Sequence, residues 1–119
     1  MRLIFKICAT IEWAEAERRG EFAGSAVDLR DGYIHFSARE QVAATAALHF
    51  AGADDLVLVA VDADALAPAL KWEPARDGSL FPHLYGTLPV AKAIWVRTLP
   101  RDATGRHRLP NLETGDPMT

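Results

Sequence analysis

The stretch "DLVLVAVDA", residues 55–63, decides the fold. Every residue between the two flanking acidic positions is apolar, and the run has the length of a strand rather than of a helix. A strand without polar alternation is buried on both faces, so it lies in the middle of a sheet. The sequence therefore predicts a central strand around which the rest of the domain packs.

Two elements precede this strand near the N-terminus. Residues 3–9, "LIFKICA", are apolar and rich in β-branched side chains, which favours a strand. Residues 10–20 favour a short helix, with Thr10 as its N-cap and Gly20 as the residue that ends it. A loop is expected over residues 21–32, where glycine, serine and aspartate are typical turn formers.

The segment "DGYIHFS", residues 31–37, alternates between polar and apolar side chains and predicts a short strand. Its polar side carries Tyr33, His35 and Ser37. A longer helix is expected over residues 37–52, because Ser37 and Glu40 match the S-x-x-E capping box.

The second half of the chain contains mostly strands. They are predicted over residues 70–73, 80–86 and 91–99, with a turn over residues 74–79 and Pro82 at an edge or entry position. A doubly wound parallel sheet would need further crossover helices here, and the sequence lacks them. The order of elements therefore predicts an α+β fold: a bent or split, mostly antiparallel sheet with two main helices.

Length and composition limit the classes of protein. We expect one domain over residues 1–99 and an irregular C-terminal tail over residues 100–119, which lacks apolar periodicity. The net charge of -3 disfavours a nucleic-acid or acidic-membrane partner. The single cysteine fits a reducing compartment, and neither a signal peptide nor a membrane-spanning run is recognisable. A cytoplasmic protein is therefore expected, with its oligomeric state left open.

Common catalytic and metal-binding motifs are not recognisable in the sequence. It contains no Walker loop, no G-x-G-x-x-G, no G-x-S-x-G and no H-E-x-x-H. The four histidines lack close ligand spacing, so no metal site is predicted. The cysteine lies in an apolar strand, where an inert buried thiol is the expected interpretation.

Three short strands each carry two polar residues on one side, because side chains alternate along a strand. The pairs are His35 with Ser37, Lys71 with Glu73, and His83 with Tyr85. If these sides converge, they form a cleft that binds a ribose- or phosphate-bearing small molecule and supplies a base. The alternative is that they form the solvent-exposed face of an antiparallel sheet, with Ser37 serving only as a helix cap.

Four strings together resemble a bacterial family known as domain of unknown function number 952. They are "GYIHFSAREQ", "LVLVAVDADAL", "LKWEP" and "LFPHLYG", and the resemblance covers residues 3–96. The family's recurring positions correspond to Trp13, Gly32, His35, Ser37, Trp72, Glu73, Pro82, His83, Tyr85 and Gly86. This resemblance implies no activity.

The N-terminal half is also remotely similar to ADP-ribosyltransferase-like folds, which bind nicotinamide adenine dinucleotide (NAD) between two halves of a split sheet. In many of these proteins the first strand carries a histidine or arginine, and here Lys6 occupies that place. The second motif, an aromatic residue-x-Ser/Thr, corresponds to His35-x-Ser37. The third motif usually holds a catalytic glutamate, for which Glu73 and His83 are the candidates.

This resemblance leads to two hypotheses from different classes. An enzyme would transfer or hydrolyse an ADP-ribose-type glycosidic bond, with NAD as substrate: His35 would position the ribose, and Glu73 or His83 would act as the base. A binding module would hold the same small molecule without turnover. In both cases Lys6, Ser37, Lys71, Trp72 and Tyr85 are the candidate ligand-binding residues. An interaction domain with an exposed sheet face is a third interpretation.

Overall fold

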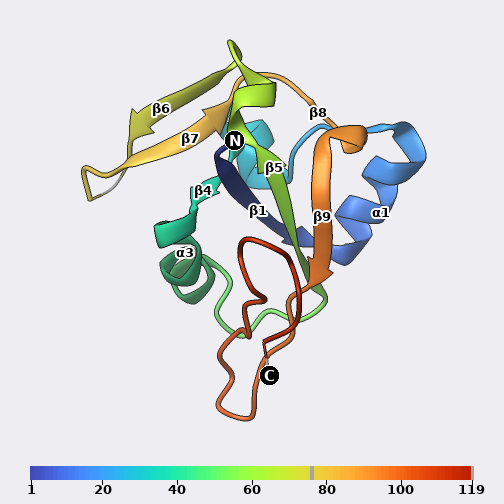
Figure 1. Ribbon diagram of the computed structural model, residues 1–119, viewed down its shortest axis with the longest axis vertical. Coiled ribbons are helices and arrows are strands. Elements are labelled where there is room, and N and C mark those ends of the chain that lie inside the picture. Colours follow the sequence, from blue (N-terminus) through green and yellow to red (C-terminus); the bar gives the residue numbers. More distant parts are fainter. Residues whose placement is uncertain (76, 119) are drawn as a thin grey trace.

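The predicted central strand is β5, and it lies inside a four-stranded sheet in the order β4-β1-β5-β9 (Figure 1). The computed structural model describes residues 1–75 and 77–118. The strands of this sheet are β1 (Leu3–Ala9), β4 (Ser37–Ala38), β5 (Leu56–Asp62) and β9 (Ala93–Thr98). β1 pairs with β5 along its whole length, and the neighbouring strands are antiparallel. The expected burial of β5 on both faces is confirmed.

The remaining strands form two smaller sheets. A three-stranded sheet has the order β3-β7-β6, and a two-stranded sheet joins β2 to β8. Their bounds are β2 (Glu21–Phe22), β3 (Ile34–His35), β6 (Leu70–Pro74), β7 (Leu80–Leu84) and β8 (Leu88–Pro89). All of these pairs are antiparallel, so the prediction of an α+β fold with mostly antiparallel sheets is confirmed.

Helices α1 (Thr10–Arg19) and α3 (Val42–His49) lie on opposite sides of the central sheet (Figure 1). The N-cap of α1 is Ala9 rather than the predicted Thr10, and Glu12 accepts a hydrogen bond from the Ala9 N–H. The predicted end of this helix at Gly20 is confirmed by its left-handed backbone, with φ of 89°. None of the helices described is long and apolar enough to cross a bilayer.

The predicted continuous strand over residues 31–37 is wrong at Phe36. Here the chain leaves the three-stranded sheet after β3 and joins the four-stranded sheet as β4. The capping role predicted for Ser37 is also wrong, because the 3₁₀-helix η1 (Arg39–Gln41) separates Ser37 from α3. The Ser37 hydroxyl instead forms a hydrogen bond of 2.9 Å with the Thr45 hydroxyl. β1 holds Ser37 in a strand, so the local capping signal is overridden.

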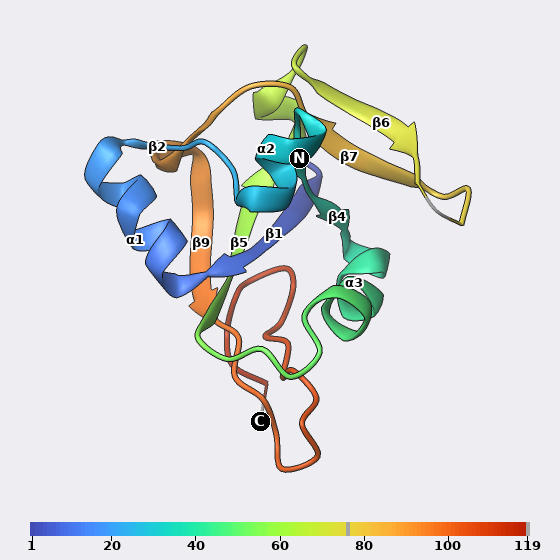
Figure 2. The same cartoon turned by 180° about the vertical axis from the view of Figure 1, so that it is seen from behind.

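The predicted loop over residues 21–32 contains a short helix, α2 (Ala26–Asp31), in addition to β2. Its N-cap is Ser25, whose N–H and hydroxyl both donate to the Asp28 carboxylate. Figure 2 shows α2 beside β1, and Asp28 contacts Lys6 of that strand. The helix has six residues, too few for apolar periodicity to reveal it in the sequence.

The prediction that Pro82 lies at an edge or entry position is wrong, because Pro82 lies inside β7, the middle strand of its sheet. On β7, only His83 and Leu84 pair with β3. The missing N–H of Pro82 therefore interrupts no hydrogen-bond ladder on that side. Its carbonyl accepts from the Phe36 N–H at 3.0 Å. In the predicted turn over residues 74–79, the Ala75 N–H donates to the Ser79 carbonyl, while residue 76 lies outside the described residues.

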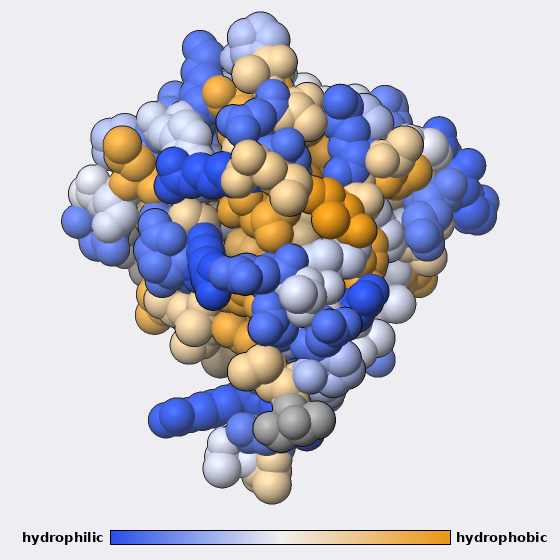
Figure 3. Space-filling model, viewed as in Figure 1, coloured by the Kyte–Doolittle hydropathy of each residue, from blue (hydrophilic) through white to orange (hydrophobic). Residues whose placement is uncertain are grey.

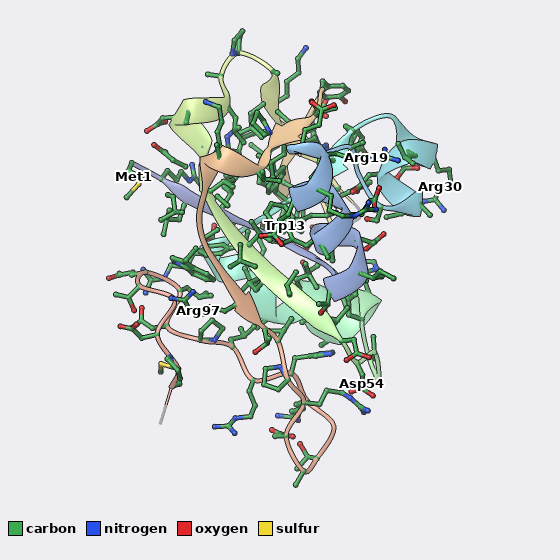
Figure 4. The ribbon with its side chains drawn as sticks, turned by 90° about the vertical axis from the view of Figure 1, so that its right-hand side faces the viewer. Met1, Trp13, Arg19, Arg30, Asp54 and Arg97 are labelled. Atoms are coloured by element: carbon green, nitrogen blue, oxygen red, sulfur yellow. The ribbon has the colours of Figure 1, made fainter. Side chains whose placement is uncertain are left out.

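A separate apolar cluster packs on each side of the four-stranded sheet. The first lies toward α1 and the three-stranded sheet and includes Ile4, Cys8, Trp13, Phe22, Ile34, Phe36, Val57, Val59 and Leu84. The second lies toward α3 and includes Phe5, Ile7, Val42, Ala46, Leu58, Ala60, Trp95 and Leu99. Figure 4 shows Trp13 in the interior beneath α1. Two further 3₁₀-helices, η2 (Ala63–Leu66) and η3 (Val90–Lys92), connect strands.

The C-terminal segment is irregular apart from an isolated bridge between Arg101 and His107, and it packs on the second cluster. Leu109 and Leu112 contact that cluster. Arg97 donates from Nε to the Gly115 carbonyl at 2.7 Å, and Figure 4 shows its side chain beside this segment. The last residue of the predicted tail, 119, lies outside the described residues.

Candidate functional site

The three-stranded sheet brings the two predicted histidines together. The register places His35 directly opposite His83, and His83 opposite Lys71. Residues directly opposite each other in an antiparallel pair point to the same face. The two imidazole rings lie edge to face, with centroids 5.6 Å apart. Both rings therefore occupy one face of the sheet, as the predicted convergence of these strands requires, and that they line a cleft stays a prediction.

Glu73 organises the outer part of this face. Its Oε1 accepts hydrogen bonds from the Tyr85 hydroxyl at 2.7 Å and from His83 Nδ1 at 2.8 Å. These two hydrogen bonds lower the pKa of Glu73 and, in return, the bond to Glu73 raises the pKa of Tyr85 to about 12. Lys71 Nζ lies 5.6 Å from the centre of the Tyr85 ring. A charged carboxylate is thus fixed between a phenol and an imidazole.

Tyr33 forms the aromatic centre of the site, although the sequence analysis did not select it. Its ring stacks on His83 at 4.1 Å with an interplanar angle of 12°. The same ring lies 4.6 Å from His35 and 5.3 Å from Tyr85. Burial raises the pKa of Tyr33. The strand alternation that groups Tyr33 with His35 was the available signal for this residue.

Asp28 lies directly beneath His35 and was also missed. Its Oδ1 is 2.6 Å from His35 Nδ1, and its two oxygens lie 2.8 and 3.1 Å from Lys6 Nζ. Burial alone would raise the pKa of Asp28, but the hydrogen bond from His35 and the charge of Lys6 outweigh it, and the pKa is lowered. This carboxylate is therefore a buried anion between two partners.

The outer nitrogen of His35 has a second carboxylate partner. Nε2 lies 3.0 Å from an oxygen of Asp31, the last residue of α2. Arg30 also pairs with Asp31, and their hydrogen bond is the main reason why the pKa of Asp31 is lowered. Figure 4 shows Arg30 pointing outward at this end of α2. A solvent-exposed ion pair therefore covers one edge of His35.

We call these side chains together the histidine face. It consists of Tyr33, His35, Lys71, Glu73, His83 and Tyr85. Exposure differs strongly across it: His83 is 5% exposed, the His35 side chain 32% and Tyr85 42%. A ligand would therefore touch His35 and Tyr85. The buried His83 would not touch it and would only hydrogen-bond to Glu73.

Three predicted site residues lie elsewhere. Lys6 is 3% exposed and reaches Asp28 rather than the surface. Ser37 pairs with Phe5, so its side chain points to the opposite face of the four-stranded sheet from Lys6. Trp72 points to the opposite face of its sheet from Lys71, where the guanidinium carbon of Arg2 lies 4.0 Å from the indole centre.

The two surface grooves do not coincide with the histidine face. One, of about 620 Å³, runs between the β6–β7 hairpin and η1 and is lined by Arg2, Gln41, Trp72 and Phe81 among others. The other, of about 400 Å³, lies near Arg2 and Leu112. In Figure 3, apolar side chains reach the surface near the centre, interrupted by hydrophilic ones. These two grooves are therefore lined by residues other than those that contact His35 and His83.

Metal and thiol chemistry have little support. Within residues 1–75 and 77–118, no three histidine, cysteine, aspartate or glutamate side chains are placed to hold a metal ion. Burial raises the pKa of Cys8 to about 12, so its sulfur stays a thiol at neutral pH. The reactive groups of the site are imidazoles, carboxylates and phenols.

The fold and the site define a class: small α+β proteins whose short antiparallel sheet carries histidines paired with carboxylates. A family model described as protein of unknown function (DUF952) matches residues 7–96, and the chain belongs to this family. The predicted membership is confirmed.

Solved structures of a Caulobacter crescentus protein, CC0527, are similar to this chain. Its crystal structure is 50% identical with a TM-score of 0.85, covering 88% of this chain and 92% of that one. Its solution NMR structure is also 50% identical, with a TM-score of 0.81 and coverage of 89% and 91%. A V27M/L66M double mutant of CC0527 has a TM-score of 0.85 at 48% identity. No curated protein matches the chain.

Proposed function

We propose that the histidine face binds an NAD-type dinucleotide by its nicotinamide-ribose end and hydrolyses or transfers its glycosidic bond. The observation that carries the proposal is the convergence of two carboxylate-paired imidazoles and two tyrosines on one face. The remote resemblance to ADP-ribosyltransferase-like folds supplies the ligand class.

The charge of the face suits the oxidised nicotinamide ring. That ring is an N-alkylated pyridinium, and aromatic faces attract cations. Tyr33 and Tyr85 offer such faces, and Glu73 and Asp31 place two carboxylates at the rim. The lowered pKa values of both carboxyl groups keep them charged at neutral pH. These groups favour a cationic, flat ring, and Lys71 adds one positive charge to the same face.

The reaction would proceed by cleavage of the bond between ribose C1 and the nicotinamide nitrogen. Nicotinamide leaves with the bonding electron pair as a neutral molecule, and the ribose carbon becomes cationic in the transition state. A water oxygen, or an acceptor nucleophile, then bonds to C1 and loses one proton to solvent. Glu73 suits this step as a charged stabiliser, because its low pKa makes it a poor proton carrier. His35 would position the ribose by hydrogen bonding to a hydroxyl group.

A binding module without turnover is the second candidate, and one observation favours it. Lys6 occupies the first-motif position, yet its ammonium group is buried against Asp28 and is not presented to a ligand. The same residues would then hold the dinucleotide without accelerating its cleavage.

Ligand-observed NMR with NAD tests the proposal. We expect saturation transfer to the nicotinamide protons for the unaltered protein and its loss in His35→Ala. Ser37→Ala is the matched control, since Ser37 lies on the other sheet face and should leave binding unchanged. Free nicotinamide accumulating over time supports the enzyme, and binding without release supports the module. Absence of NAD binding by the folded, unaltered protein would overturn both.

A further inference from the structure

We infer that Asp28 is a positioning residue that fixes the ring orientation and tautomer of His35, and that Lys6 is its buried counter-ion rather than a ligand contact. Asp28 and Lys6 have these roles in the protein without any ligand. That the oriented ring then meets a nucleotide rests on the proposed function.

Both oxygens of Asp28 are fully used inside the protein. Oδ1 lies 2.6 Å from His35 Nδ1 and accepts from the His35 backbone N–H at 3.1 Å. Oδ2 accepts from Lys6 Nζ at 2.8 Å, and from the N–H and hydroxyl of Ser25 at 2.9 and 3.0 Å. Oδ1 thus contacts both the ring and the backbone of His35. Oδ2 is held by Lys6 of β1 and by Ser25, the N-cap of α2.

The surroundings prevent Asp28 from turning away. Its side chain is almost fully buried, and a Cβ built on Gly24 would lie 2.8 Å from the Asp28 Cβ. Glycine at position 24 therefore lets this loop pass close to the carboxylate. A buried anion without a cation is costly, and Lys6 supplies the compensating charge from β1. The central sheet in this way determines where the imidazole of β3 points.

The chemistry of the contacts specifies one proton. A carboxylate only accepts hydrogen bonds, so His35 Nδ1 must carry a hydrogen to bond Asp28. Asp31 faces Nε2 from the exposed side, and both nitrogens donate at once only in the doubly protonated ring. Of the two carboxylates, Asp28 is rigid and Asp31 is partly exposed and shared with Arg30. Asp28 therefore determines that the hydrogen of the neutral ring stays on Nδ1.

Nitrogen-15 NMR of the imidazoles tests this directly in the unaltered protein. At a pH where the nitrogen-15 shifts themselves show a neutral ring, we expect His35 to be the Nδ1–H tautomer. The Asp31→Asn variant should give the same tautomer. An Nε2–H tautomer, or an average of both, in the unaltered protein would overturn the inference without any appeal to a ligand.

Two double variants separate the hydrogen-bond acceptor from the charge. Lys6→Met/Asp28→Asn removes both charges but retains an amide oxygen that accepts from Nδ1, so the Nδ1–H tautomer should persist. Lys6→Met/Asp28→Leu removes the acceptor as well, and the tautomer should shift toward Nε2–H, which Asp31 accepts. If both variants keep the Nδ1–H tautomer, Asp28 does not position the ring.

Titration with NAD adds a functional readout. The Leu double variant should bind NAD at least about tenfold more weakly than the Asn double variant, the loss expected for one well-placed hydrogen bond. If the unaltered protein has the Nδ1–H tautomer but does not bind NAD, the proposed function fails and the positioning role stands. If NAD binds but the tautomer is Nε2–H, the positioning role fails and NAD binding stands.

Discussion

On one face of β1, Ile4, Lys6 and Cys8 point toward α1 and α2, while Phe5 and Ile7 point toward α3 on the other. Both faces are buried, but only the first contains a charge. An apolar pair in place of a buried ion pair is often as stable or more so. The ion pair on the first face is therefore better explained by what it orients than by what it stabilises. On the second face the same strand is buried by apolar contacts of Phe5 and Ile7.

Breaking the ion pair on one side should produce the largest effect. Asp28→Ala leaves the Lys6 ammonium buried without a partner, and we expect a loss of about 3–5 kcal/mol in unfolding free energy. Urea unfolding followed by circular dichroism measures it. Lys6→Met/Asp28→Leu, which removes both charges, should recover most of this loss. A single variant as stable as the double would show that the pair is not coupled.

Acid should weaken the charged face selectively. The pKa of Asp28 is lowered in the folded protein, whereas in the unfolded chain it should lie near about 3.9. The stabilisation by this carboxylate is therefore complete above that pH and is lost as pH falls toward the folded value. Urea unfolding at about pH 6 and about pH 3 should show a larger loss in the unaltered protein than in Lys6→Met/Asp28→Asn. Equal losses would contradict the assignment.

A change on the apolar face should cost less. Gly115 has φ of 77°, and a Cβ built there would lie 2.7 Å from the Trp95 ring. Gly115→Ala should therefore destabilise the protein by about 1–3 kcal/mol, because the indole or the C-terminal segment must shift. Thermal unfolding measures the loss, with Gly105→Ala as the control, since that position has a similar φ of 90° but only one distant neighbour. Equal losses would mean that backbone strain alone is responsible.

The smallest effect is expected at Ser37. Ser37→Ala removes the hydroxyl bond to Thr45 and should cost about 0.5–1.5 kcal/mol, the net value of one hydrogen bond. Ser37→Asp should be worse than Ser37→Ala, because it buries a carboxylate where no helix begins. Chemical denaturation of both variants decides the matter. A rescue by aspartate would restore the capping assignment.

Elements that depend on local pattern were predictable from the sequence. β5 follows from its unbroken apolar run and the end of α1 from Gly20, because each signal lies within the element itself. The shared face of His35 and His83 followed from strand alternation and needed only correct pairing.

Features that depend on distant partners were not predictable. The contact between Lys6 and Asp28 joins residues 22 positions apart, and Asp28 lies in a helix too short to leave a periodic pattern. Ser37 matched a capping box, but pairing of β4 with β1 overrode it.

Phe36 is the only residue between β3 and β4, so one peptide segment belongs to two sheets. Its N–H donates a hydrogen bond to the Pro82 carbonyl, and its side chain is 2% exposed. The junction is therefore held by both backbone and side-chain contacts. A change at His35 should therefore be felt by the backbone at Ser37 and Ala38. We expect amide hydrogen exchange in β4 to report on His35 from a distance and to accelerate when its Asp28 anchor is removed.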